Sequence, residues 1–199
     1  ASLHGGGAIN QYGPDQPRTT IDFSTITMNA AHSSLSERDG LWIERGSIQI
    51  TASILQHTGD SCEFENGVTM QSGGYNINHD GSTENNPCQL GGTSDLFDLD
   101  PSLDSLTDNG GPTLTLGFDE DDPPEFYLVP HGEAGCGTTT RYDQRGGVRM
   151  KDGCHRGAVQ RNGCVAMLLS DLNDVRASET NFAVQYLINT AENNDTLYV

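Results

Sequence analysis

Aspartates supply the densest group of side chains that can bind a metal. Five of them lie within 14 residues, namely Asp95, Asp98, Asp100, Asp104 and Asp108. Hard cations such as Ca²⁺ take about six to eight oxygen ligands from carboxylates, carbonyls and water. The spacing differs from an EF-hand, because no Gly lies mid-loop and no Glu closes it. The sequence favours solvated turn residues, with calcium as a cofactor on Asp98, Asp100, Asp104 and Asp108 as the alternative.

Catalytic side chains cannot be chosen from the histidines or the carboxylates. The six histidines show no HxH or HExxH spacing, and only His79-Asp80 and His131 with Glu133 form close His–carboxylate pairs. A glycoside hydrolase needs two carboxylates about 5–10 Å apart. Among 28 acidic residues, the sequence singles out no such pair. We therefore predict no catalytic residues.

The five cysteines indicate an oxidising compartment. Each lies among Gly, Asn, Asp or Ser residues that favour loops, and their spacing matches no zinc site. Cysteines in loops of an acidic, Gly-rich chain are typical of disulfides. Because the number is odd, one cysteine is free or pairs outside the chain.

The charge distribution excludes some classes of partner. The formal net charge is −18, and the stretch between Arg45 and Arg141 contains 16 Asp and Glu but no Lys or Arg. Such a chain repels phosphate, so we expect neither nucleic acid nor an anionic membrane surface as partner. The sequence contains no apolar run of about 18 residues, so we expect no membrane insertion. The gap in basic residues also argues against a polysaccharide lyase, which needs a Lys or Arg base.

The elements that would position these residues are short strands. Runs rich in β-branched residues are separated by Gly, Asn and Asp, and residues 21–26 align with residues 50–55 at an offset of 29. Gly-led runs at residues 5–9 and 40–43 precede these two segments at looser spacing. Repeats of this length predict stacked coils that bury a shared narrow core. A β-sandwich is the alternative from periodicity alone.

Several motifs resemble the choice-of-anchor Q domain family, which closes the end of right-handed parallel β-helices on surface proteins. The motifs occupy residues 72–81, 99–103, 106–115, 143–146 and 153–159, and the Asp-Asn-Gly-Gly-Pro-Thr segment at residues 108–113 is the most specific. The resemblance departs from the family at residues 118–129, where acidic residues and prolines replace an apolar strand. It implies an all-β, right-handed parallel β-helix over residues 1–160, with irregular capping loops.

Local roles follow for several polar residues and for the cysteines. We expect the Asp108–Gly111 turn to be structural, and Arg145 to pair with Asp143 or with a carbonyl. The loop positions predict two disulfides and one remaining thiol: Cys62 with Cys88, Cys136 with Cys154, and Cys164 free or intermolecular.

Residues 161–199 are expected to form a β-strand extension, either the start of another domain or an assembly strand. Asn194 lies in a glycosylation sequon.

The expected function is that of a non-catalytic extracellular or cell-surface protein, such as an adhesin, a stalk or a fibre subunit. Open solenoid ends and an unpaired C-terminal strand would allow strand addition from other copies or neighbouring domains. Cys164 would then link subunits. The alternative is a polysaccharide-active enzyme or a glycan-binding module on the same fold, with glycans as partners. Trp42 is expected to be a core residue rather than a sugar platform.

Overall fold

A computed structural model describes residues 7–13, 15–29, 38–80, 86–118, 127–149, 153–160, 166–169, 175–177 and 196–198. The chain divides into two compact units, Ala1–Pro101 and Ser102–Val199. The division does not coincide with the boundary expected between residues 160 and 161, which stays a prediction. Each unit is described separately below.

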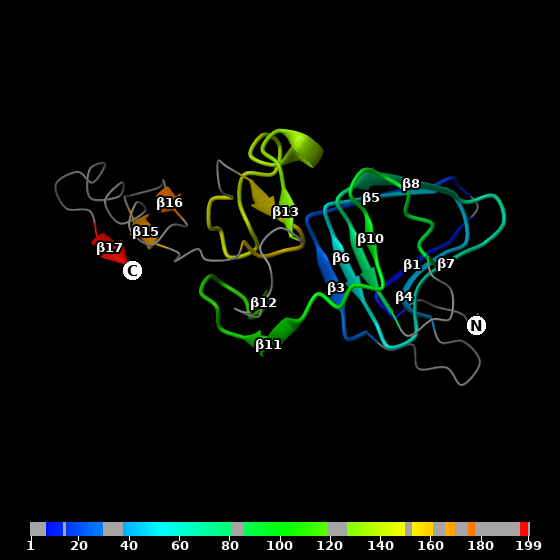
Figure 1. Ribbon diagram of the computed structural model, residues 1–199, viewed down its shortest axis with the longest axis horizontal. Coiled ribbons are helices and arrows are strands. Elements are labelled where there is room, and N and C mark those ends of the chain that lie inside the picture. The colour runs from blue at the N-terminus through cyan, green and yellow to red at the C-terminus, as the bar shows by residue number, and fades with distance from the viewer. Residues whose placement is uncertain are drawn as a thin grey trace. The chain divides into compact units, whose positions relative to one another are not determined.

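Three parallel β-sheets form the sides of the first unit, and its coils stack on one another (Figure 1). Each successive coil contributes one strand to each sheet. The first coil has β1 (Ile9–Gln11), β2 (Arg18–Asp22) and β3 (Thr25–Thr27). The second has β4 (Arg38–Ile43), β5 (Ser47–Thr51) and β6 (Ile54–Gln56). The third has β7 (Asp60–Phe64), β8 (Thr69–Gly74) and β9 (Ile77–His79), and β10 (Leu96–Phe97) extends the third sheet.

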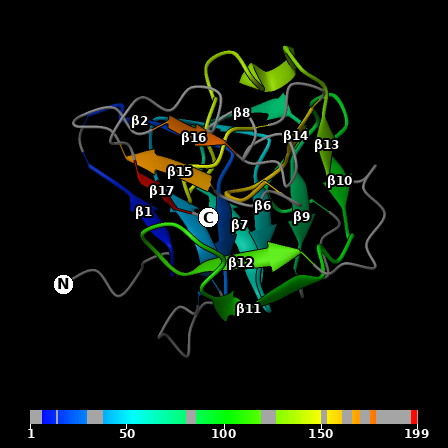
Figure 2. The same ribbon diagram turned by 90° about the vertical axis from the view of Figure 1, so that its left-hand side faces the viewer.

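The strand order confirms the predicted parallel β-helix. The sheets have the orders β1-β4-β7, β2-β5-β8 and β3-β6-β9-β10, and every pairing within them is parallel. Figure 2 shows β6, β9 and β10 side by side. Ile21 pairs with Ile50 and Thr25 with Ile54, which is the predicted offset of 29 residues. The next coil is shorter, because Ile54 pairs with Ile77.

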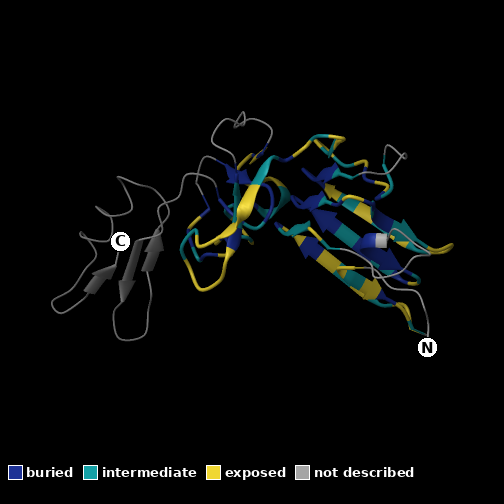
Figure 3. Cartoon of the chain, turned by 90° about the horizontal axis from the view of Figure 1, so that it is seen from below, coloured by how far each residue is buried: buried dark blue, intermediate teal, exposed yellow. Residues whose placement is uncertain are grey.

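The apolar core lies inside the coils. In β5, Ile48 and Ile50 are buried whereas Gln49 between them is only half-buried, the alternation expected of a strand with one inner face. Leu41, Ile43 and Leu55 belong to the same cluster. Each fully buried aliphatic side chain contributes about 1.5–3 kcal/mol of transfer free energy. In Figure 3 the strands of the first unit alternate between dark blue buried segments and teal or yellow ones.

A left-handed corner recurs before every strand of the third sheet. The corner residues Phe23, Ala52, Tyr75 and Ser94 all have positive φ, between 45° and 61°. Backbone N–H groups at these corners connect the coils: Phe23 donates to Thr51, Ala52 to Gly74 and Tyr75 to Thr93. Non-glycine residues in this region are strained unless the surrounding structure over-determines them. Hydrogen bonds between the coils supply that constraint.

The residue that follows each corner is small and polar, and together these residues form a ladder along the stack. They are Ser24, Ser53, Asn76 and Asp95. Ser24 N donates to Ser53 Oγ at 3.1 Å, Ser53 N to Asn76 Oδ1 at 3.0 Å, and Asn76 N to Asp95 Oδ1 at 2.8 Å. The side chains of Ser53, Asn76 and Asp95 therefore each satisfy the main chain of the coil before.

Asn76 is the most connected member of the ladder. It is fully buried, and Asn76 Nδ2 donates to Ile50 O, Ser72 Oγ and Asp95 Oδ1 at 3.0–3.1 Å. Ser72 Oγ in turn donates to Asp95 Oδ2 at 2.6 Å. The oxygen and the nitrogen of the Asn76 amide are thus both used inside the stack, where an unmade hydrogen bond is costly.

The second unit is built from antiparallel pairs. Strand β11 (Leu103–Thr107) pairs with β12 (Thr115–Phe118), and β13 (Leu128–Val129) pairs with β14 (Cys154–His155). A short 3₁₀ helix spans Glu133–Gly135.

Among the described residues, three short strands lie within residues 161–199, the range of the expected β-strand extension. Strand β15 (Ala166–Leu169) is antiparallel to both β16 (Val175–Ala177) and β17 (Thr196–Tyr198). The expectation of an unpaired C-terminal strand is therefore wrong, because β17 is paired within its own chain.

The ladder predicts a large effect of Asn76→Ala on stability. The substitution leaves the Ser53 N–H and the Ile50 carbonyl without their buried partner, so we expect the free energy of unfolding to fall by about 2–3 kcal/mol. Gln71→Ala is the matched control, because Gln71 is exposed on β8 and its loss costs at most about 0.5 kcal/mol. Urea unfolding of the two variants measures the difference, and equal midpoints would contradict the ladder's importance.

Candidate functional site

The four aspartates of the calcium prediction are divided between the two units of the chain, and calcium binding there stays a prediction. Asp98 and Asp100 belong to the first unit, Asp104 and Asp108 to the second, and all four are exposed. Among the described residues, no group of three or more His, Cys, Asp or Glu side chains is arranged to hold a metal ion.

Two of these carboxylates make hydrogen bonds to other residues of the chain. Asp100 Oδ1 accepts a hydrogen bond from Gln56 Nε2 at 3.2 Å, and Asp108 Oδ1 accepts one from Gly110 N at 3.0 Å. The second contact is the turn expected from the Asp-Asn-Gly-Gly segment. Their exposure agrees with the interpretation that the sequence favours, that of solvated turn residues.

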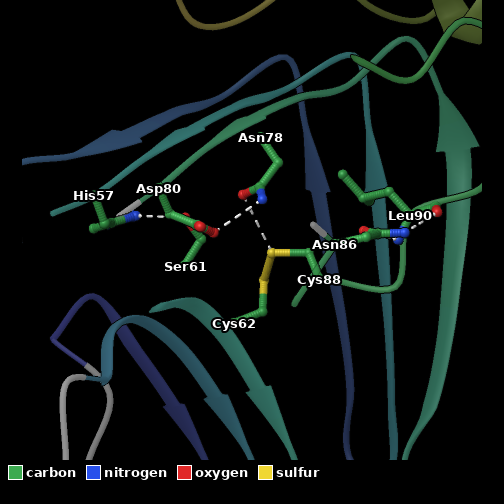
Figure 4. Close-up of a disulfide and its surroundings, with 8 residues drawn as sticks. All are labelled: His57, Ser61, Cys62, Asn78, Asp80, Asn86, Cys88 and Leu90. Carbon is green, nitrogen blue, oxygen red and sulfur yellow. Dashed lines mark hydrogen bonds between the residues drawn. A yellow bond between two sulfur atoms is a disulfide. The ribbon is translucent and has the colours of Figure 1, made fainter. Parts of the chain in front are cut away.

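The first predicted disulfide closes one end of the β-helix. Cys62 on β7 is bonded to Cys88, and both belong to the buried core cluster together with Leu90. Asn86 holds the loop in shape, because Asn86 Oδ1 accepts from Leu90 N at 2.9 Å and Asn86 Nδ2 donates to Leu90 O at 2.6 Å. Residues 86–90 therefore form a cap over the core, shown in Figure 4.

A buried histidine lies near this cap, and the sequence reasoning did not single it out. His57 Nδ1 is 3.3 Å from Ser61 Oγ, and His57 Nε2 is 3.5 Å from Asn29 Nδ2 (the Ser61 contact is drawn in Figure 4). Asp39 Oδ2 accepts from Gly59 N at 3.0 Å. Burial lowers the pKa of His57, while the nearby charges of Asp39 and Asp80 oppose that shift. No sequence signal pointed to this pair, because an i, i+4 spacing brings side chains together in a helix, whereas His57 and Ser61 lie at the joint between β6 and β7.

His57 and Ser61 are the residue types of a nucleophilic site, but a substrate cannot reach them. A serine nucleophile must reach a substrate carbonyl, and its base must be within hydrogen-bond distance. Ser61 is 0% exposed and His57 only 6%. The arrangement therefore satisfies buried polar groups at the joint between β6 and β7 and does not present a nucleophile.

Arg145 pairs with Asp143 in the second unit, as the sequence predicted. Arg145 Nη2 lies 2.8 Å from Asp143 Oδ2 and 2.6 Å from Gln160 O, and Arg145 Nη1 donates to Asn109 O at 3.2 Å. Asp143 also accepts from Gly147 N and Gln160 N. Both expected partners of Arg145, the carboxylate and a carbonyl, are therefore present, and the pair ties three segments of the unit together.

The second predicted disulfide, Cys136–Cys154, is also present. Its two cysteines are fully buried, and Cys154 lies on β14. The bond joins the loop of the 3₁₀ helix to the β13–β14 pair. Two disulfides indicate that the chain folds in an oxidising compartment. Cys164 and Asn194 lie outside the described residues, so the predictions made for them stay predictions.

An open groove of about 640 Å³ lies on the first unit. Its lining includes Gln16, Trp42, Glu44, Arg45, Glu65 and Asn66. Trp42 is on the face of β4 opposite Leu41 and Ile43, since successive residues of a strand point to opposite sides. It is nevertheless only 4% exposed, so its ring is packed, as expected, and does not serve as a platform for a sugar.

Comparison with known proteins returned no relative. No protein-family description, curated protein or solved structure matches the chain significantly. In the part of the chain that the structure describes, no helix is long and apolar enough to cross a membrane.

The lowered pKa of His57 predicts an acid-dependent loss of stability. The folded state favours the neutral ring, so the unfolded state binds more protons, and the free energy of unfolding falls as pH drops below the ordinary value of 6.5. His57→Gln removes this titration and keeps a polar group beside Ser61. We expect its urea midpoint to change less between about pH 7.5 and pH 5.0 than that of the wild type. The exposed His131→Gln is the control, and an unchanged pH dependence in His57→Gln would contradict the prediction.

The cap predicts a stabilising role for the Cys62–Cys88 bond. Its removal in a Cys62→Ala/Cys88→Ala variant frees a loop of 26 residues, which corresponds to about 3–4 kcal/mol in the chain-entropy account. Cys136→Ala/Cys154→Ala, with a separation of 18 residues, is the matched variant in the second unit. Thermal and urea unfolding under non-reducing conditions would measure both losses. A midpoint unaffected by the first variant would show that the cap does not depend on the disulfide.

Proposed function

We propose that the chain is a non-catalytic structural module of an extracellular or cell-surface protein, serving as a stalk, an adhesin part or a fibre subunit. The observation that carries this proposal is the ladder of Ser53, Asn76 and Asp95 inside a disulfide-capped solenoid. Each coil is bonded to the next through main chain and side chain alike. A stack of this kind suits a mechanical or spacing element.

The location outside the cell rests on two further features. Both disulfides are buried and join loops to strands, as in proteins that mature in oxidising compartments. The net charge of −18 keeps such a surface soluble and discourages non-specific contact with nucleic acid. The motif resemblance to the choice-of-anchor Q domain family belongs to the same proposal, because that family occurs on surface proteins.

Assembly by strand addition follows from the asymmetry of the first unit. One end is covered by the cap at residues 86–90. At the other end, β1, β2 and β3 pair only with β4, β5 and β6 among the described residues. An edge strand with unpaired main-chain groups is a template for another strand. We infer that a second copy, or a neighbouring domain, adds its strands at the first coil.

The hydrogen-bond pattern identifies which groups face this edge. Phe23 N donates to Thr51 O on the β5 side, and alternate residues of a parallel strand bond to opposite neighbours. Ile21 therefore also bonds toward β5, whereas the N–H of Thr20 faces the open edge.

Thr20→Pro tests this assembly directly. Proline removes a donor from the open edge and leaves the bonds to β5 intact, as prolines do in natural edge strands. We expect the wild-type chain to self-associate with rising concentration and Thr20→Pro to remain monomeric in sedimentation velocity. Thr20→Val, which keeps the N–H group, is the control and should associate like the wild type. A wild-type chain that stays monomeric at high concentration, with no fibres by negative-stain microscopy, would overturn assembly through this edge.

A further inference from the structure

Basic residues gather around a small pocket in the second unit of this otherwise acidic chain. The pocket has a volume of about 280 Å³ and is lined by His131, Gly137, Arg141, Tyr142, Val148 and Arg149. None of these described lining residues is acidic. Arg141 is also the residue that ends the long stretch without Lys or Arg that begins after Arg45. The pocket is therefore lined by the first Lys or Arg residue that follows Arg45 in the sequence.

The wall of the pocket is held in place by main-chain contacts. Arg149 N donates to Arg141 O at 2.8 Å, so the two arginines come from paired segments. Gly137 has a φ of 68°, and a Cβ at this position would lie 2.5 Å from the His131 ring. Only glycine therefore allows the ring to pack against the chain here. The Cys136–Cys154 bond fixes the same loop.

The two arginines have different roles. Arg149 is buried, and its Nη1 and Nη2 donate to His155 O and Gly157 O at 2.8 Å each. Burial lowers the pKa of Arg149 to about 10, so the side chain is still charged at neutral pH. Arg141 is exposed, and its side chain donates from Nε to Thr138 O at 3.1 Å. Within the described residues, the terminal nitrogens of Arg141 have no hydrogen-bond partner, so they can bind a ligand.

Tyr142 and Val148 add an apolar side to the pocket. They pair across an isolated β-bridge and are 59% and 37% exposed. The carboxylate next to Tyr142 in the chain, Asp143, is already paired with Arg145. The pocket thus offers positive charge from two arginines beside an exposed aromatic ring.

We propose that this pocket binds an acidic sugar, that is, one sugar ring carrying a carboxylate. The planar guanidinium of Arg141 matches a carboxylate through two parallel hydrogen bonds, and the ring of Tyr142 packs against the apolar face of the sugar. The volume fits one ring rather than a long chain segment, because pockets for drug-sized ligands begin at about 300 Å³. This site goes beyond the structural role proposed above and does not depend on assembly at β2.

Calorimetric titration of the full chain with trigalacturonate tests the proposal. We expect binding of trigalacturonate, and no measurable binding of neutral galactotriose at the same concentration. Arg141→Gln should weaken binding about tenfold or more, the effect of losing a charge-assisted hydrogen bond. Tyr142→Ala should also weaken binding. Arg45→Gln, which removes the same charge in the first unit, is the matched control and should bind like the wild type.

The outcomes separate the sugar from simpler ligands. Displacement of trigalacturonate by sulfate or acetate at equal concentration would show an anion site without sugar recognition and would overturn the proposal. Equal affinity in Arg141→Gln and the wild type, or no binding at millimolar concentration, would do the same. Arg141→Lys should restore part of the affinity, because it keeps the charge but loses the paired geometry. Because Arg141 and Tyr142 are exposed, unchanged circular dichroism is expected for all variants.

Discussion

Hydrogen bonds between successive coils, made by the side chains that follow each left-handed corner, are the constraint on which the first unit depends. Ser53, Asn76 and Asp95 each accept a main-chain N–H from the coil before. Three side chains that differ in size carry out this same task. The coils therefore need a polar acceptor of suitable reach at one position, while the loops between other strands are free to differ in length.

That constraint also explains the unusual backbone of the corners. Phe23, Ala52 and Tyr75 adopt positive φ although none is glycine. The strain of such a conformation, about 1–2 kcal/mol per residue, is offset because the N–H of each corner residue bonds to the next coil. The corner, the ladder and the parallel register thus support one another, and the apolar core of Ile48 and Ile50 fills the space that they enclose.

The second unit achieves order by different means. Its described strands are short and antiparallel, and a buried ion pair, Asp143–Arg145, lies inside it. A buried charge pair is tolerated when its remaining hydrogen-bond positions are satisfied. Here Asn109 O, Gln160 O and the N–H groups of Gly147 and Gln160 provide those partners. The disulfide Cys136–Cys154 adds a covalent tie, and the loop that it holds leads into Arg141 and Tyr142.

Local patterns in the sequence predicted repeated strands, and the 29-residue offset between Ile21 and Ile50 becomes a direct pairing. Periodicity alone also allowed a β-sandwich, and the motif resemblance favoured the parallel β-helix. Local patterns also predicted both disulfides and the Asp143–Arg145 pair, whose partners lie in recognisable loops or two residues apart. Packing alone placed Ser61 beside His57 inside the fold and brought Arg141 and Arg149 to one pocket. The exposure of these side chains, and which of them lie together, depend on how distant segments fold against one another. Neither spacing nor composition could therefore predict them. The order of polar and apolar runs along the chain determines that it forms short repeated strands, because each run can bury one face of a strand. The tertiary structure decides which polar side chains are buried and which can meet a ligand, because burial depends on contacts between distant segments.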